Sequence, residues 1–223
     1  MLHEFLTANR QLLIRLCREK AARRFGSDEA AATIDHGVPL FLQQLVETLR
    51  TEQRTGSRDD PESTATPAPT AIGRSAALHG TELLRRGFSV DQVVHEYGDV
   101  CQCVTALAIE QDVGILADEF RTLNRCLDNA IADAVASFGS ARQTSIDHQA
   151  ETLEQRLAAF AEDHRRLVDI ASKSLTAIRT GNIGVSGATG TLLAHTLEEL
   201  SSLADRSLPE IRLASPGAKA VAA

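Results

Sequence analysis

An all-α fold is what this sequence predicts, and three observations support it. Aromatic residues make up only 4% of the 223 residues and Trp is absent, while Ala, Leu, Glu, Gln and Arg recur throughout, a composition that favours helices over sheets. Apolar residues return at steps of three and four, the spacing of one helix face. From 116 to 178 there is no proline and one glycine, Gly139, which predicts a very long helix that bends near this glycine.

Composition and charge exclude several classes of function. Hydrophobic residues are 43% of the chain, enough for a substantial core, and the net charge of -7 comes from mixed signs without a basic stripe. A nucleic-acid partner is therefore not expected. No apolar run approaches the roughly 20 residues of a membrane span, and the N-terminus lacks a secretion signal, so we predict a cytoplasmic protein that does not enter a membrane.

The four cysteines, Cys17, Cys101, Cys103 and Cys126, show no CxxC spacing. We interpret them as reduced, mostly buried structural thiols. Cys101 and Cys103 point to different sides of a helix, because two residues turn it by about 200°. The sequence therefore predicts no metal site, and it predicts no cofactor.

The first half of the chain divides into helices and one loop. Residues 2–25 predict a single amphipathic helix. A second helix follows, which Gly37 and Pro39 are expected to interrupt around His36 before it resumes over 40–52. Residues 54–70 combine three prolines with polar residues and predict a mobile loop.

Helical patterning returns over 72–86 and ends at Gly87. Ser89 and Gln92 then have the spacing of a capping box, in which each side chain bonds the other residue's backbone amide. A well-defined helix with one apolar stripe should follow to about residue 111.

The last third predicts a helical hairpin. Its first helix carries a narrow seam with nearly coiled-coil spacing, interrupted by one extra four-residue step at Ala171. The seam residues are Leu153, Leu157, Phe160, His164, Leu167, Ala171, Leu175 and Ile178. Glycines break the helix over 180–190, and a second helix is expected over 191–212. Two such hairpins would form a four-helix bundle, so we predict a homodimer.

Three stretches, taken in order, resemble a known protein family. They are His79-Gly80 with 85–99 (RRGFSVDQVVHEYGD), then 120–131 (FRTLNRCLDNAI), then 180–190 (TGNIGVSGATG) leading into 205–213 (DRSLPEIRL). Together they make the chain similar to bacterial sensor histidine kinases whose input region resembles stressosome RsbR-type (RsbRD) N-terminal domains. The resemblance implies an input domain over 1–140, for which a globin-like fold is one candidate. It also implies a dimerisation and histidine-phosphotransfer (DHp) hairpin over 141–213 and a disordered tail over 214–223.

The chain departs from that family at the reactive residue. Such kinases carry an Ala-His-Glu-Leu-Arg-Asn type motif, and alignment through Phe160 and Leu167 puts Glu162 in the place of the histidine. A carboxylate cannot replace the imidazole that accepts phosphate. His164 is a possible substitute, but it lies two residues on, about 200° around the helix and on the seam. With no segment for an ATP-binding domain after the hairpin, we expect no enzyme activity.

His79, His95 and Tyr97 are the candidate ligand-binding residues of the input domain, because they fall on neighbouring predicted helices. In a globin-like pocket His95 would ligate haem or donate a hydrogen bond to a small molecule. The competing interpretation is that these are structural core residues.

Three functional hypotheses remain open on the sequence. The leading one is a non-catalytic two-component signal-transduction protein that regulates a histidine kinase or a response regulator by binding it. The second is a histidine phosphotransfer protein that uses His164. The third is a globin-like sensor of haem or another small ligand.

Overall fold

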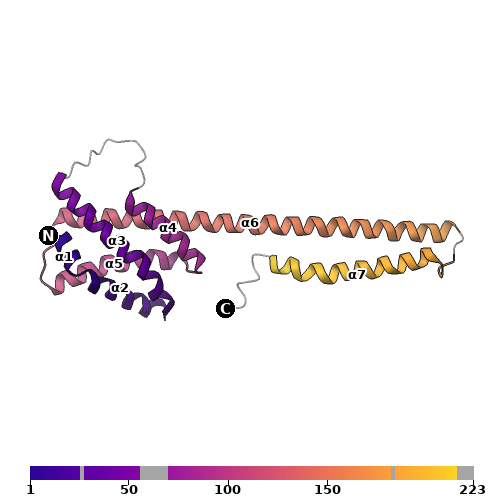
Figure 1. The fold of residues 1–223 in the computed structure, drawn as a ribbon, viewed down its shortest axis with the longest axis horizontal. Coiled ribbons are helices and arrows are strands. Elements are labelled where there is room, and N and C mark those ends of the chain that lie inside the picture. Colours follow the sequence, from indigo (N-terminus) through magenta and orange to yellow (C-terminus); the bar gives the residue numbers. More distant parts are fainter. Residues whose placement is uncertain (26–27, 56–69, 182–183, 215–223) are drawn as a thin grey trace. The chain divides into compact units, whose positions relative to one another are not determined.

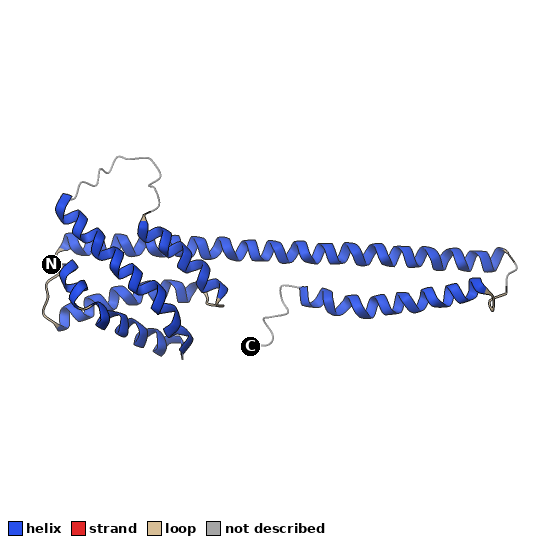
Figure 2. Cartoon of the chain, viewed as in Figure 1, coloured by secondary structure: helices blue, strands red, loops and turns tan. Residues whose placement is uncertain are grey.

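The computed structural model describes residues 1–25, 28–55, 70–181 and 184–214, and all regular structure within these ranges is α-helical (Figures 1 and 2). The all-α prediction is therefore confirmed. Residues 56–69 of the predicted loop and residues 215–223 of the predicted tail lie outside the described ranges. The helices are α1 Leu2–Ala8, α2 Arg10–Phe25, α3 Asp28–Thr55, α4 Ala71–Arg85, α5 Val90–Glu110, α6 Ala117–Thr180 and α7 Ala188–Ala214.

Contacts divide the chain into two compact units, Met1–Arg142 and Gln143 onward. The first unit consists of α1 to α5 with the beginning of α6, and the second consists of the rest of α6 with α7. Helix α6 therefore contributes residues to both units. None of the described helices has the length and apolar character needed to cross a membrane.

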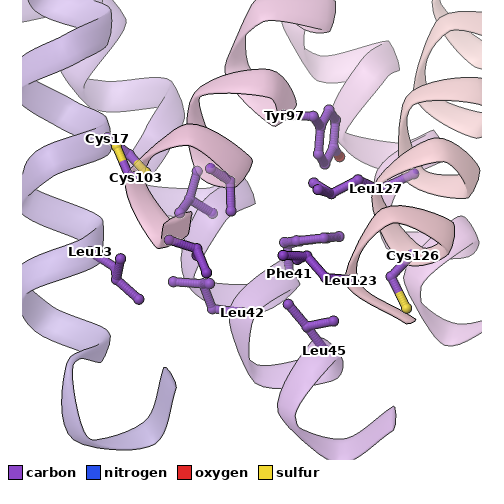
Figure 3. Packing of buried hydrophobic residues seen from close by; sticks show 14 of the residues in the cluster. Leu13, Cys17, Phe41, Leu42, Leu45, Tyr97, Cys103, Leu123, Cys126 and Leu127 are labelled. Carbon is purple, nitrogen blue, oxygen red and sulfur yellow. The ribbon is translucent and has the colours of Figure 1, made fainter. Parts of the chain in front are cut away.

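The core of the first unit is built from one apolar stripe on each of its helices (Figure 3). Leu45 of α3, Val93 and Val104 of α5, and Leu123 of α6 are completely buried. Each such side chain contributes about 1.5–3 kcal/mol relative to an exposed one. The stripe predicted for α5 thus faces the core, and the capping box between Ser89 and Gln92 that starts this helix is present.

The expected interruption at Gly37 and Pro39 is wrong, because α3 continues through both residues. A proline inside a helix costs about 3 kcal/mol. Val38 and Phe41 on either side of it are each 3% exposed, and their burial offsets that cost. Gly37 has a packing role: a Cβ there would lie 2.6 Å from Nε2 of His79 on α4.

The single helix predicted over 2–25 is also wrong, because the chain breaks at Asn9 into α1 and α2. The Asn9 side chain donates a hydrogen bond to the Phe5 carbonyl at 3.1 Å. It also exchanges two hydrogen bonds with the amide of Gln111, at 3.0 and 3.3 Å. The backbone amide of Asn9 also bonds the Phe5 carbonyl, so the side-chain bonds add to the backbone bond at this helix end.

The second unit contains the two long helices of the tail. The α6 helix runs unbroken to Thr180, beyond the predicted end at 178. Figure 1 shows α7 returning alongside its last part. Leu167 on α6 and Leu203 on α7 are 3% and 9% exposed, although most residues around them face solvent. Since these helices supply the described residues of the unit, each of the two leucines is covered by the other helix.

Gly80 should be essential for packing α4 onto α6, because an added Cβ would lie 2.1 Å from the Ala134 carbonyl oxygen. We predict that Gly80→Ala lowers the free energy of unfolding by about 1–3 kcal/mol through overpacking. Gly98→Ala is the matched control, since a Cβ at this helical glycine meets nothing within 4 Å. The control should gain about 0.5–1 kcal/mol. Equal stabilities for the two variants in urea unfolding would contradict the close approach.

Candidate functional site

Glu162 and His164, the predicted reactive positions of the hairpin, are both exposed on α6. The His164 ring lies beside Phe160, with ring centroids 5.9 Å apart. Asp163 between them pairs with Arg166 at 3.2 Å, one turn along the helix. Both candidates therefore lie on the surface of the single chain. Among the contacts of the described residues, no other titratable side chain pairs with Glu162 or His164.

The predicted seam divides into two parts. Leu167 is buried against α7, whereas Leu157 and Leu175 remain 44% and 48% exposed. Val168, which the sequence interpretation did not include, is 41% exposed. One stripe of α6 therefore faces α7, and a second stripe of apolar residues faces solvent.

The second stripe has the regular spacing that the predicted seam lacked. Residues 157, 161, 164, 168, 171, 175 and 178 follow each other at alternating steps of four and three. This alternation is the heptad pattern of helices that pack along their length. Including Ala161 and Val168 removes the irregular step at Ala171, so the signal was present in the sequence.

Helix α7 exposes apolar side chains on the same side of the hairpin. Val168 directly follows buried Leu167 on α6, and Leu197 directly follows buried Thr196 on α7. One residue turns a helix by about 100°, and equal rotations about two antiparallel axes lead to the same side. We call this surface the apolar face. Its exposed members are Leu157, Ala161, His164, Val168 and Leu175 of α6 with Leu197 and Leu208 of α7.

In the first unit, two of the three predicted ligand-binding residues lie together. The rings of His79 and Tyr97 meet edge to face, with their centroids 6.3 Å apart. The ring of Phe41 also meets Tyr97 edge to face, with the centroids 5.7 Å apart. Tyr97 is 5% exposed, and burial raises the pKa of its phenol above the ordinary value. The pair is part of the packed core.

Glu96 completes this cluster and was missed by the sequence interpretation. Its Oε2 lies 3.0 Å from Nε2 of His79, and the two side chains are 9% and 8% exposed. The other carboxylate oxygen, Oε1, is buried without a hydrogen-bond partner. A signal existed, because Glu96 stands three residues after Val93 and four before Val100, on the apolar stripe of α5.

His95 lies apart from this cluster. Its ring is 46% exposed and its Nε2 is 3.3 Å from Asp91 on the same helix. His79 is held by Glu96 and packed against Gly37, so its Nε2 is already engaged. These three predicted residues therefore do not form a haem-ligating pocket.

A cleft of about 300 Å³ opens elsewhere in the first unit, between α3, the start of α4 and α6. Glu52 in its wall accepts a hydrogen bond from Thr122 at 2.5 Å and pairs with Arg125. Cys126 also lines the cleft, and burial raises the pKa of its thiol to about 11. None of the predicted ligand-binding residues lines this cleft.

The described residues indicate no metal site, and the sequence matches no known family. Across the described ranges, no group of three or more His, Cys, Asp or Glu side chains is placed to hold a metal ion. Comparison with protein-family models, with curated proteins and with solved structures finds no match to this chain.

His79 is buried and paired, whereas His95 is exposed, so their substitution should affect stability differently. His79→Ala should lower the free energy of unfolding by about 3 kcal/mol, because it leaves the buried Glu96 carboxylate without its partner. His95→Ala, the matched control at an exposed site, should change stability by less than about 0.5 kcal/mol. Urea unfolding measures both. Similar losses in the two variants would show that the buried pair is not the source of the effect.

Proposed function

We propose that this chain is a non-catalytic signal-transduction protein that forms a homodimer through its hairpin and regulates a two-component partner by binding. The observation that carries the proposal is the apolar face, which a single chain leaves in contact with water. Leu157, Leu175 and Leu197, each 44–54% exposed, form part of it. Burying such side chains is favourable by about 25 cal/mol for each Å² of apolar surface.

A second copy of the same hairpin is the occupant that fits this face. The α6 stripe has heptad spacing, which favours packing against another helix along its length. Two hairpins joined through their apolar faces would form a four-helix bundle, in which each helix has two neighbours. The apolar seam between Leu167 and Leu203 within the protomer would then continue into the interface between protomers.

The same geometry supports regulation by binding. Glu162 is exposed and lies about 120° around α6 from Val168 in the apolar face, so a bundle would leave it accessible. A histidine kinase or a response regulator that recognises phosphotransfer hairpins could dock there without receiving or donating phosphate, since a carboxylate does not form phosphohistidine. In this proposal the chain competes with, or pairs with, an active partner.

Helix α6 connects the first unit to the hairpin of the second unit. Leu123 and Leu127 near its start are packed in the core of the first unit, and Leu167 is packed against α7. A change in core packing that moves the start of this helix would be carried along it, because packed elements respond by discrete shifts. This supports a role for the first unit as the sensing part.

Substitution in the apolar face tests the dimer. Leu175→Glu and Leu197→Glu place a charge in the proposed interface and should raise the dimer dissociation constant at least about 100-fold, or about 2.7 kcal/mol. Leu78→Glu is the control, because Leu78 of α4 is even more exposed, at 75%, and lies in the first unit. Sedimentation equilibrium measures association, and circular dichroism confirms that each variant is folded.

A wild-type chain that is monomeric at micromolar concentration would contradict this proposal. So would an equal effect of Leu78→Glu, because that result would trace association to general surface hydrophobicity.

The exposure of His164 favours a second candidate function, histidine phosphotransfer. Incubation with an active histidine kinase and ATP would then place acid-labile phosphate on the chain. His164→Ala should abolish the label, while His148→Ala, at another exposed position of α6, should retain it. If the chain is a non-catalytic regulator, neither the wild type nor the variants become labelled. Phosphate on His164 would contradict that proposal and support histidine phosphotransfer.

A further inference from the structure

Two cysteines from distant parts of the sequence meet in the core of the first unit. Cys17 of α2 and Cys103 of α5 share a side-chain hydrogen bond. Figure 3 shows their sulfur atoms next to each other where these helices face one another. They are 1% and 7% exposed, so Cys103 lies nearer to solvent. Both thiols are free in this structure.

The surroundings of the pair make the two thiols unequal. Donation from the Cys17 thiol is the largest cause that lowers the pKa of Cys103. The positive charges of Lys20 and Arg23 also lower it, whereas burial and the negative charge of Asp99 oppose them. The pKa of Cys17 is raised by the same hydrogen bond and by its burial. Cys103, which is the more exposed of the two and whose pKa is lowered, is therefore the thiol that should react first.

An ion-pair cluster between α2 and α5 lies one turn of α5 from Cys103. Asp99, one turn earlier on α5, is 2% exposed and its Oδ1 lies 2.9 Å from Arg24 and 3.5 Å from Lys20. Oδ2 of Asp99 is buried without a hydrogen-bond partner. Both cations come from α2, the helix that carries Cys17. The two helices therefore meet through a charged cluster as well as through sulfur.

The remaining cysteines lack this arrangement. Cys101 is half-buried, and burial raises its pKa. Cys126 lies at the cleft beside Thr48, and burial raises its pKa to about 11. These two thiols provide internal controls for any reaction of Cys17 and Cys103.

We propose that Cys17 and Cys103 form a reversible disulfide in response to hydrogen peroxide, which makes the first unit a redox-responsive input. The Cys103 thiolate attacks one peroxide oxygen, the O–O bond breaks, and hydroxide leaves with Cys103 as a sulfenic acid. The Cys17 sulfur then attacks the Cys103 sulfur, the S–O bond breaks and water leaves. Two thiols and one peroxide give one disulfide and two waters, and a dithiol reductant restores the thiols by exchange.

The disulfide would link α2 covalently to α5. Val100 and Val104 on the same helix as Cys103 are buried in the core that also holds Leu123 of α6. Closing a bond between α2 and α5 therefore fixes two of the helices that form this core. The reduced pair lacks this covalent constraint.

The test uses the full chain, treated with hydrogen peroxide and then with an alkylating reagent that blocks the remaining thiols. Mass spectrometry of the digest should show a peptide pair joined through Cys17 and Cys103, lighter by two hydrogens and lost after dithiothreitol. Tandem fragmentation distinguishes Cys103 from Cys101, which lies on the same peptide. Cys101→Ser and Cys126→Ser should retain the cross-link.

A second measurement distinguishes the roles of the two cysteines. In Cys17→Ser the sulfenic acid on Cys103 cannot be resolved, so dimedone should label Cys103 after peroxide treatment. In Cys103→Ser no cross-link and no label on Cys17 are expected. The proposal is overturned if both thiols of the wild type are recovered alkylated after peroxide, or if the cross-link joins other cysteines.

Discussion

The organisation of this protein depends on a helix that has more apolar surface than its own chain covers. In the first unit the start of α6 is packed into the core, with Leu123 and Ala130 completely buried, although Phe120 is 39% exposed. In the second unit the described part of the chain gives α6 only α7 as a neighbour. A second stripe with heptad spacing is left facing water, and the occupant we propose for it is a second hairpin.

Helix α5 holds several of the buried polar groups of the first unit. Glu96, Asp99 and Cys103 follow one another near one side of it and take their partners from different helices: His79 of α4, Lys20 and Arg24 of α2, and Cys17 of α2. Burying such groups is costly unless they are paired. They therefore fix which helices meet α5, while one oxygen each of Glu96 and Asp99 stays without a hydrogen bond. A chemical change at α5 would therefore alter its contacts with both α4 and α2.

Local signals in the sequence predicted local structure well, and contacts between distant segments decided the rest. The spacing of Ser89 and Gln92 defines a helix start without outside help, and the structure contains it. The same reasoning failed at Pro39, where burial of Val38 and Phe41 outweighs the local cost, and at Asn9, whose partner Gln111 is remote in sequence. His79 was singled out, but its partner Glu96 and the meeting of Cys17 with Cys103 depend on helix packing that periodicity does not specify.

Photo-crosslinking from the hairpin surface tests most directly whether a second copy covers the apolar face. A photoreactive side chain at Val168, in the middle of that face, should give covalent dimers joined to α6 or α7 of the other copy. The same group at Glu162, about 120° around the helix, should give none. Equal yields from the two positions, or no dimer from Val168, would contradict the account.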